Sequence, residues 1–383
     1  MNFRYCLDCE PSLRRWLISV SILFVLAAAA KAELPAEQRE FIEQRAREEI
    51  SRQGIPGLSV AVAVENALQY EAGFGQADVE NAVPARADTL YRTASIAKPI
   101  TATAVMQLAE AGKLELDAAV WKYCSEFPAK PWPVTSRQLL GHLGGVRHYN
   151  QPVETTETRH YFTLRPALAI FADDPLLHEP GTRYHYTTYG YNLVGAVAEC
   201  AAKQEFCELL REKVLEPAGM KATCEDDQRA VIVGRARGYV RPEQKDIDKL
   251  PADNDLKPRE LYNAALHDTS SKIPGGGLLS TAPDLVRFAI AMNTKKLLNE
   301  QTLGAMWTNQ RTKDGKETNY GLGWRIGMLE GKKSVAHGGG QAGTSTYLLL
   351  LPEQGVAVAV MCNLQGAKVE KLAEEVAGRV VRE

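Results

Sequence analysis

Ser95 and Lys98 are the residues of this sequence with the clearest potential for nucleophilic chemistry. They stand three positions apart in the stretch Ser95-Ile96-Ala97-Lys98-Pro99. At the start of a helix this spacing puts both side chains on one face, so the hydroxyl and the amine can form a hydrogen bond. Pro99 indicates such a start, because N–H groups of the first helical turn have no intrahelical partner. We expect Ser95 near the N-cap as a nucleophile and Lys98 as its base.

The apolar run that follows this pair, Ile100 to Leu108, predicts a dry environment for the Lys98 amine. Burial lowers the pKa of an ammonium group and lets the neutral amine act as a base near pH 7. The positive end of the helix dipole favours a Ser95 alkoxide. A Ser-x-x-Lys tetrapeptide is common by chance, however, and the alternative is an N-capping Ser with a solvated Lys. Partner residues elsewhere in the chain decide between the two interpretations.

Tyr186 is a candidate for a third catalytic group. It belongs to the aromatic, turn-rich segment Pro180 to Tyr191, which predicts a helix from about Tyr189 capped by Thr187 or Thr188. Tyr186 would then project from a loop at the mouth of that helix, where a phenol can relay protons. The alternative for this segment is an aromatic packing cluster.

Two glycine-rich segments complete the set. His337-Gly338-Gly339-Gly340 precedes an apolar stretch, and the Gly340 N–H could join the Ser95 N–H in an oxyanion hole. The alternative is a flexible turn between strands. The second segment, Pro274 to Asp284, predicts a tight bend that shapes the floor of a pocket. A helix from Pro283 to Met292, capped by Ser280 or Thr281, is expected to follow this bend.

These four elements occur in this order, separated by about 90, 90 and 60 residues. The arrangement resembles the serine β-lactamase and penicillin-binding-protein superfamily, specifically the class C β-lactamase-related serine hydrolases, over about residues 40 to 380. The stretch Leu139 to Tyr149 resembles a loop of the mitochondrial serine β-lactamase-like proteins, which are therefore the nearest subgroup.

The resemblance implies a role for each motif residue. Ser95 would be the acylated nucleophile, Lys98 its base, and Tyr186 the group that shuttles a proton to the leaving group and activates the deacylating water. His337 would position the substrate or tune Tyr186. Contacts with the substrate or the oxyanion are implied for Thr188, His337, Gly338 and Gly340. The implied mechanism is acyl transfer without a metal or an organic cofactor.

Two residues depart from the pattern of the β-lactamases. Thr188 stands where these enzymes usually carry Asn, and His337 stands where they usually carry a Lys that faces the antibiotic carboxylate. His is largely neutral near pH 7 and would not supply the charge of that Lys. Together the two departures favour an esterase or peptidase over an efficient β-lactamase.

The pattern of apolar residues predicts an α/β fold with a sheet built from both ends of the chain. Strands are expected at Leu58 to Val64, Leu68 to Phe74, Gly321 to Ile326, Ser345 to Leu351 and Val356 to Cys362, and terminal helices at Ala36 to Gln53 and about Lys368 to Val381. The resemblance implies a β-lactamase/transpeptidase-like fold with an antiparallel sheet. We expect an α/β lobe from 36–94 plus 271–383, a mainly helical lobe from 95–270 and the active site between them.

The N-terminus predicts export. Arg14-Arg15 precede the apolar stretch Trp16 to Ala30, and Ala30-Lys31-Ala32 is a small-x-small cleavage site, so 1–32 reads as a signal peptide cleaved after Ala32. An uncleaved membrane anchor is the alternative. The mature protein would be periplasmic or extracellular.

Composition excludes some functions and leaves the cysteines unassigned. With 45 basic and 47 acidic residues, a net charge of −2 and no dense basic run, the chain is not expected to bind nucleic acid. Removal of Cys6 and Cys9 with the signal leaves Cys124, Cys200, Cys207, Cys224 and Cys362, without metal-type spacing. We expect mostly buried free thiols, with one disulfide through Cys124 or Cys224 as the alternative.

The sequence therefore predicts a secreted serine hydrolase that cleaves a peptide, amide or ester bond in a small substrate. The alternatives are a class C-type β-lactamase, a D-alanyl-D-alanine carboxypeptidase, or an inert binding protein on the same fold. An α/β-hydrolase and a zinc hydrolase are disfavoured, because the sequence has no Gly-x-Ser-x-Gly elbow and no His-Glu-x-x-His motif. The remaining histidines are expected to be ordinary hydrogen-bonding residues: His142, His148, His160, His178, His185 and His267.

Overall fold

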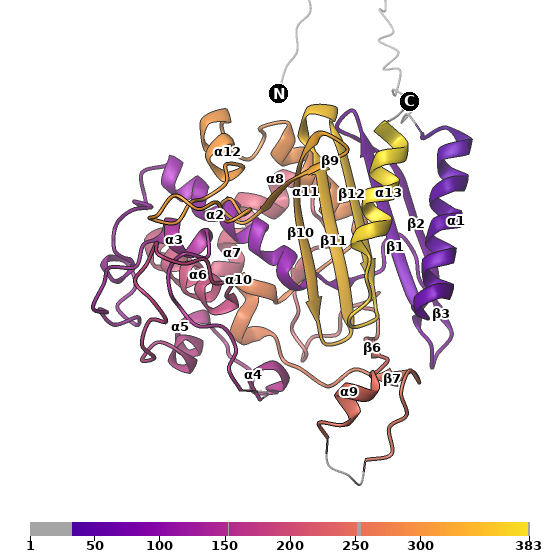
Figure 1. Ribbon diagram of the computed structural model, residues 1–383, viewed down its shortest axis with the longest axis horizontal. Helices are drawn as coiled ribbons and strands as arrows, with labels where there is room; N and C mark the ends of the chain where they lie inside the picture. The colour runs from indigo at the N-terminus through magenta and orange to yellow at the C-terminus, as the bar shows by residue number, and fades with distance from the viewer. Residues whose placement is uncertain (1–32, 152, 251–253, 382–383) are drawn as a thin grey trace, which may run out of the picture. The chain divides into compact units, whose positions relative to one another are not determined.

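The computed structural model describes residues 33–151, 153–250 and 254–381, so the predicted signal segment lies outside the described residues. A seven-stranded antiparallel sheet joins the two ends of the chain, in the spatial order β3-β2-β1-β12-β11-β10-β9 (Figure 1). Its strands are β1 (Gly57–Val64), β2 (Ala67–Asp78), β3 (Val83–Pro84), β9 (Arg325–Leu329), β10 (Lys332–Gln341), β11 (Thr344–Leu351) and β12 (Val356–Cys362). The expectation of an antiparallel sheet from both chain ends is confirmed.

Both faces of this sheet are buried, which explains why its central strands are apolar throughout. Along β12, Val358 and Val360 pack into one hydrophobic cluster whereas Ala357 and Ala359 pack into the other, as the two-residue period of a strand requires. The terminal helices α1 (Ala36–Gln53) and α13 (Glu370–Val381) cover the first face, and α11 (Ala282–Asn293) covers the second.

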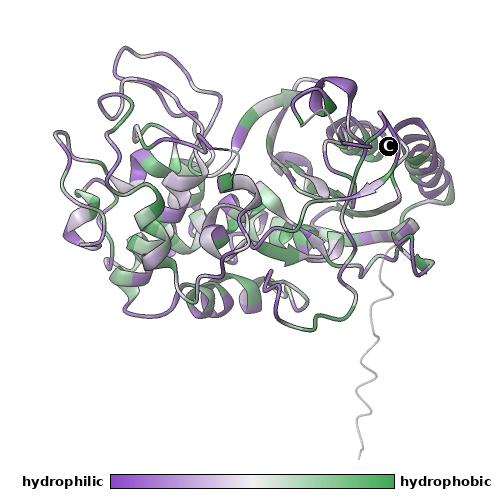
Figure 2. Cartoon of the chain, turned by 90° about the horizontal axis from the view of Figure 1, so that it is seen from below, coloured by the Kyte–Doolittle hydropathy of each residue, from purple (hydrophilic) through white to green (hydrophobic). Residues whose placement is uncertain are grey.

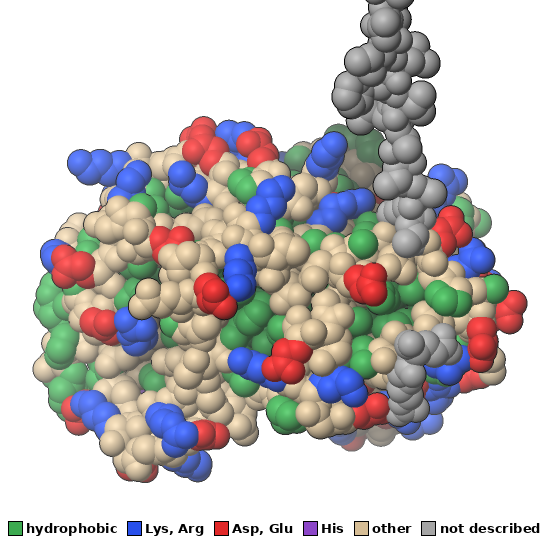
Figure 3. Space-filling view, turned by 90° about the horizontal axis from the view of Figure 1, so that it is seen from above, with side chains coloured by type: hydrophobic (Ala, Val, Ile, Leu, Met, Phe, Trp, Pro, Cys, Tyr) green, Lys and Arg blue, Asp and Glu red, His purple; other side chains and the backbone are tan. Residues whose placement is uncertain are grey.

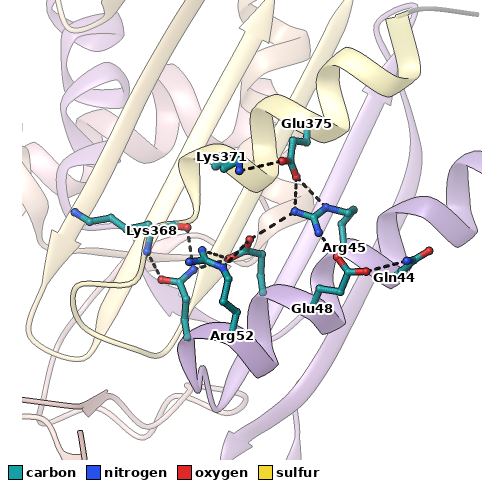
Figure 4. Close-up of polar contacts among 9 residues, drawn as sticks. Gln44, Arg45, Glu48, Arg52, Lys368, Lys371 and Glu375 are labelled. Carbon is teal, nitrogen blue, oxygen red and sulfur yellow. Dashed lines mark hydrogen bonds and ion pairs between the residues drawn. The ribbon is translucent and has the colours of Figure 1, made fainter. Parts of the chain in front are cut away.

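Polar contacts join the two terminal helices at the edge of their apolar contact (Figure 4). The Arg45 guanidinium of α1 donates to the Glu375 carboxylate of α13 at 2.7 Å, and the Lys368 N–H donates to Gln53 Oε1 at 2.8 Å. A partly exposed ion pair such as Arg45–Glu375 contributes roughly 0–1 kcal/mol. The apolar packing beneath them is therefore the main term that holds the chain ends together.

Most strand boundaries follow the sequence pattern, and the exceptions have local causes. The β1–β2 hairpin turns at Glu65 and Asn66, which both have positive φ, the geometry that matches the twist of paired strands. The strand predicted at Gly321 to Ile326 is wrong at its start, because Gly323 adopts a left-handed φ of 93° and β9 begins only at Arg325.

The middle of the chain is mainly helical and contains two further small sheets. The segment that follows Arg241 contains the short helix α9 (Gln244–Ile247). The other helices are α2 (Ala97–Glu110), α3 (Ser136–Leu140), α4 (Val153–Thr156), α5 (Leu164–Ala167), α6 (Thr188–Ala202), α7 (Phe206–Leu210), α8 (Glu216–Ala218), α10 (Ile273–Gly276) and α12 (Glu300–Met306). The small sheets contain β4 (Tyr91–Arg92), β8 (Leu278–Ser280) and β5 (Cys224–Glu225), and β6 (Tyr239–Val240) with β7 (Tyr262–Asn263). Hydrophobic residues concentrate in the central elements and hydrophilic ones in the outer loops (Figure 2).

The surface carries charges of both signs. On the face shown in Figure 3, Lys and Arg side chains lie interspersed with Asp and Glu. Within the described ranges, no helix has the length and hydropathy needed to span a bilayer. The mixture of positive and negative side chains on the face in Figure 3 is typical of a solvated surface.

Candidate active site

Ser95 lies in a tight turn directly before α2. The turn is a 3₁₀ helix over Ala94–Ile96, and the N-cap of α2 is Ile96, so Ser95 lies one residue before the N-cap, near it as expected. Ser95 lines a cavity of about 470 Å³. Ala94 holds a φ of 46°, a conformation that is strained for a residue with a Cβ.

The Gly339 backbone supports this turn from the neighbouring strand. A Cβ on Gly339 would lie 2.4 Å from the Thr93 carbonyl oxygen and 3.1 Å from the Ala94 Cβ, so only glycine permits this approach. The His337-to-Gly340 segment is therefore part of the regular strand β10 rather than a flexible turn. Gly340 lines the cavity, as its predicted oxyanion role requires, whereas Gly338 pairs with Tyr347 and is not among the lining residues.

Lys98 is fully buried, and its amine lies between three oxygen atoms. The Lys98 Nζ is 3.0 Å from Ser95 Oγ, 3.3 Å from Thr188 Oγ1 and 2.7 Å from the Gly275 carbonyl oxygen. A Cβ on Gly275 would lie 2.5 Å from the Thr188 side chain, so glycine is needed for α10 to come this close. The Pro274-to-Gly277 bend, expected only to shape the pocket floor, thus also supplies a direct partner to Lys98.

This environment favours the neutral amine. Burial, reinforced by the positive charge of Lys272, holds the pKa of Lys98 well below its usual value. A neutral amine has two N–H groups and one lone pair. The Gly275 carbonyl can only accept a hydrogen bond, so it takes one N–H, and Thr188 Oγ1 can take the other. The lone pair is then available to the Ser95 hydroxyl proton.

Tyr186 completes the cluster from the loop before α6. The Thr187 hydroxyl accepts the Gly190 N–H at 3.2 Å and caps α6, which confirms the predicted helix start. The Lys98 Nζ lies 4.9 Å from the Tyr186 ring centroid. Burial raises the pKa of Tyr186, and its hydrogen bond with Ser95 opposes that rise in part. The phenol is therefore protonated near neutral pH and can donate a proton.

His337 is placed differently from the substrate contact that the resemblance implied. Its ring is buried, it is not among the residues that line the cavity, and both of its nitrogens have partners. The Nδ1 lies 2.7 Å from the Gly338 carbonyl and the Nε2 lies 2.8 Å from the Tyr320 hydroxyl. Because a carbonyl can only accept, Nδ1 carries the proton and Tyr320 donates to Nε2. Burial and the Lys98 charge lower the pKa of His337 to about 3. The His337 ring lies 6.4 Å from the Tyr186 ring, centroid to centroid, and the second expected role, tuning of Tyr186, stays a prediction.

Two other histidines hold the Tyr186 loop. His142 Nδ1 accepts the Thr187 N–H at 3.2 Å, and His148 Nδ1 accepts the Thr188 N–H at 3.2 Å. The His142 ring also packs against the Tyr186 ring with centroids 4.3 Å apart. Burial lowers the pKa of His148 to about 4, so it stays an acceptor near pH 7. Both histidines form hydrogen bonds, as expected. No local pattern in the sequence, however, indicates that they lie behind Tyr186.

No group of metal ligands adjoins the cavity among the described residues. Within that part of the chain, the potential ligand atoms of Cys124, Glu126 and Cys200 lie within 4.8 Å of one another, and none of the three residues lines the cavity. The five described cysteines are all free thiols, as we expected, rather than partners in a disulfide. Three of them are only half-buried.

Three comparisons place this geometry among known proteins. A family model described as Beta-lactamase matches residues 39–381. The mitochondrial serine beta-lactamase-like protein LACTB of Homo sapiens is 29% identical over 433 residues, covering 85% of this chain and 76% of the human protein. An octameric penicillin-binding protein homologue from Pyrococcus abyssi has a TM-score of 0.75 at 24% identity over 90% of this chain and 78% of that chain. A D-amino acid amidase from Ochrobactrum anthropi SV3 has a TM-score of 0.76 at 21% identity over 91% and 98%.

Proposed function

Because this chain belongs to the beta-lactamase family, whose model matches most of its length, we propose that it is a serine hydrolase that forms an acyl-enzyme on Ser95. The similarity to the Pyrococcus abyssi protein also confirms the predicted transpeptidase-like fold class. The observation that carries the proposal is the 3.0 Å contact between the Ser95 hydroxyl and the buried Lys98 amine. We also propose, from the sequence of 1–32, that the protein is exported.

The proposed acylation uses three groups. The neutral Lys98 amine takes the proton of Ser95, and Oγ attacks the carbonyl carbon of the substrate. The N–H groups of Ser95 and Gly340 bind the developing oxyanion. Tyr186 donates its proton to the departing amine or alcohol and recovers one from the Lys98 ammonium. In deacylation water attacks the ester carbonyl and gives a proton to Tyr186, which passes its own phenolic proton to the neutral Lys98 amine. The Lys98 ammonium then returns a proton to the Ser95 oxygen as the ester bond breaks.

The departures at Thr188 and His337 favour an ordinary amide or ester as the substrate. The Thr188 hydroxyl is already occupied by Lys98, and the neutral, buried His337 offers no charge to a β-lactam carboxylate. One neighbour in fold is a D-amino acid amidase, so D-amino acid amides belong among the compounds to test.

A substrate panel tests this proposal. We expect kcat/KM for the best p-nitrophenyl ester or amino acid anilide to exceed that for nitrocefin by about 10-fold or more. The panel should contain both D- and L-amino acid anilides, and active protein should be counted by titration with a fluorophosphonate probe. A preference for nitrocefin would favour the β-lactamase alternative. Absence of turnover and of labelling across the panel would favour the inert binding protein.

A further inference from the structure

Lys272 is a second buried lysine beside the nucleophile. It ends the short 3₁₀ helix Ser270–Lys272, directly before the α10 bend whose Gly275 carbonyl contacts Lys98. The Lys272 side chain is only 4% exposed, yet it lines the same cavity as Ser95 and Tyr186. A buried ammonium group is costly unless a partner compensates its lost hydration.

That partner is not supplied by the part of the chain that the structure describes. No hydrogen bond or ion pair reaches the Lys272 Nζ there, and the ring of Tyr149 lies 5.6 Å away, a weak cation–π contact. The carboxylate that acts on Lys272 electrostatically, Asp226, is engaged by the Arg92 guanidinium at 2.7 Å and the Gln228 amide at 2.9 Å. The Lys272 ammonium therefore faces the cavity with its donors available.

The cavity wall has the composition of an anion site. Of the described residues that line it, none is an Asp or a Glu. The Gln341 side chain also lines it and has a buried Nε2 without a hydrogen-bond partner, which adds a neutral donor. An adjoining cavity shares Ala265, His267 and Ala342 with this one and is lined by Arg92, Arg235 and Arg237. Each of these arginines is paired with a carboxylate, Asp226 or Glu80, so among the described residues Lys272 is the cation that the Ser95 cavity itself contributes.

We propose that Lys272 is a specificity-determining residue that binds a carboxylate of the substrate in the Ser95 cavity. The inference rests on the proposed function and makes the substrate an acidic amide or ester. The cationic contact that His337 does not supply would thus come from a different segment of the chain. Burial and the charge of Arg92 lower the pKa of Lys272 to about 7, so a bound carboxylate would favour its charged form.

Matched substrates that differ only in charge test the proposal. Anilides of short peptides with Asp or Glu should be compared with those carrying Asn or Gln, in both the D and L series. We expect the wild type to prefer the acids, and Lys272→Met to lower kcat/KM for the acids by about 100-fold while the amides change less than about threefold. Lys272→Arg should keep the preference, and the exposed control Lys113→Met should change neither. Lys272→Gln serves if Lys272→Met does not fold.

A binding measurement separates this inference from the proposed hydrolysis. Glutarate should bind the Ser95→Ala protein in calorimetry, and adding Lys272→Met should abolish that binding. Two results would overturn the inference and leave the proposed hydrolase function standing. One is equal glutarate binding with and without the Lys272 side chain, and the other is a wild-type protein that is labelled on Ser95 but does not prefer acidic substrates. Lys272-dependent glutarate binding without labelling of Ser95 would keep the anion site and overturn the hydrolase.

Discussion

Ser95→Ala is expected to abolish covalent labelling by a fluorophosphonate probe and to lower kcat/KM for the best substrate by about 10⁴-fold or more. The acyl-enzyme needs an oxygen nucleophile at this position, and an Ala side chain cannot form the ester. The Ser95 Oγ contacts the Lys98 amine, a contact between side chains that the fold of the turn does not depend on. The variant should therefore fold like the wild type. Intact-mass spectrometry and peptide mapping measure the label and its position.

The exposed Ser125 provides the matched control, since Ser125→Ala removes a hydroxyl elsewhere and should leave labelling and turnover unchanged. Labelling of Ser95→Ala at the wild-type rate, or a label mapped to another residue, would contradict the assignment of the nucleophile.

Lys98→Met is expected to slow acylation of Ser95 by about 10³-fold, within the range by which a positioned general base accelerates a reaction. Met fills a similar volume in the buried site and has no basic atom. It also leaves the Gly275 carbonyl without its donor, so a thermal melt must show that the variant is folded. Single-turnover acylation by an ester measures the step directly.

Lys98→Arg distinguishes a base from a fixed positive charge. The guanidinium keeps hydrogen-bond donors and charge, but it does not lose its proton in proteins. If Lys98 acts as the base, Arg should be about as slow as Met. Fast acylation by Lys98→Arg would mean that the group near Ser95 acts through its charge, and the proposed proton transfer would be wrong.

The elements that depend on local pattern were predictable from the sequence. The helix Ala36–Gln53 and the strand Val356–Cys362 match the structure at both ends. Their apolar residues follow the period of the element, and glycine or turn residues end them. The Ser95–Lys98 contact was predictable for the same reason, because a spacing of three residues determines proximity in a helical turn.

The surroundings of that pair were not predictable, because they come from contacts between distant segments. The Gly275 carbonyl reaches Lys98 across 177 positions of sequence, and Tyr320 reaches His337 across the edge of the sheet. No spacing rule connects such residues. The sequence therefore identified Lys98 and His337 correctly as part of one region, but it did not show that His337 is enclosed or that Lys272 faces the cavity.

Direct titration of Lys98 tests most sharply whether a neutral amine serves as the base. The protein is labelled with ¹³C at lysine Cε for NMR. The Lys98 resonance is the one lost in Lys98→Met, and the Lys272 resonance is the one lost in Lys272→Met. We expect Lys98 to titrate well below ~10.4, the usual lysine value, because burial disfavours its charged form, and acylation to rise with the neutral fraction. A Lys98 that stays protonated up to about pH 10, while acylation already proceeds at full rate near neutral pH, would contradict the proposed mechanism.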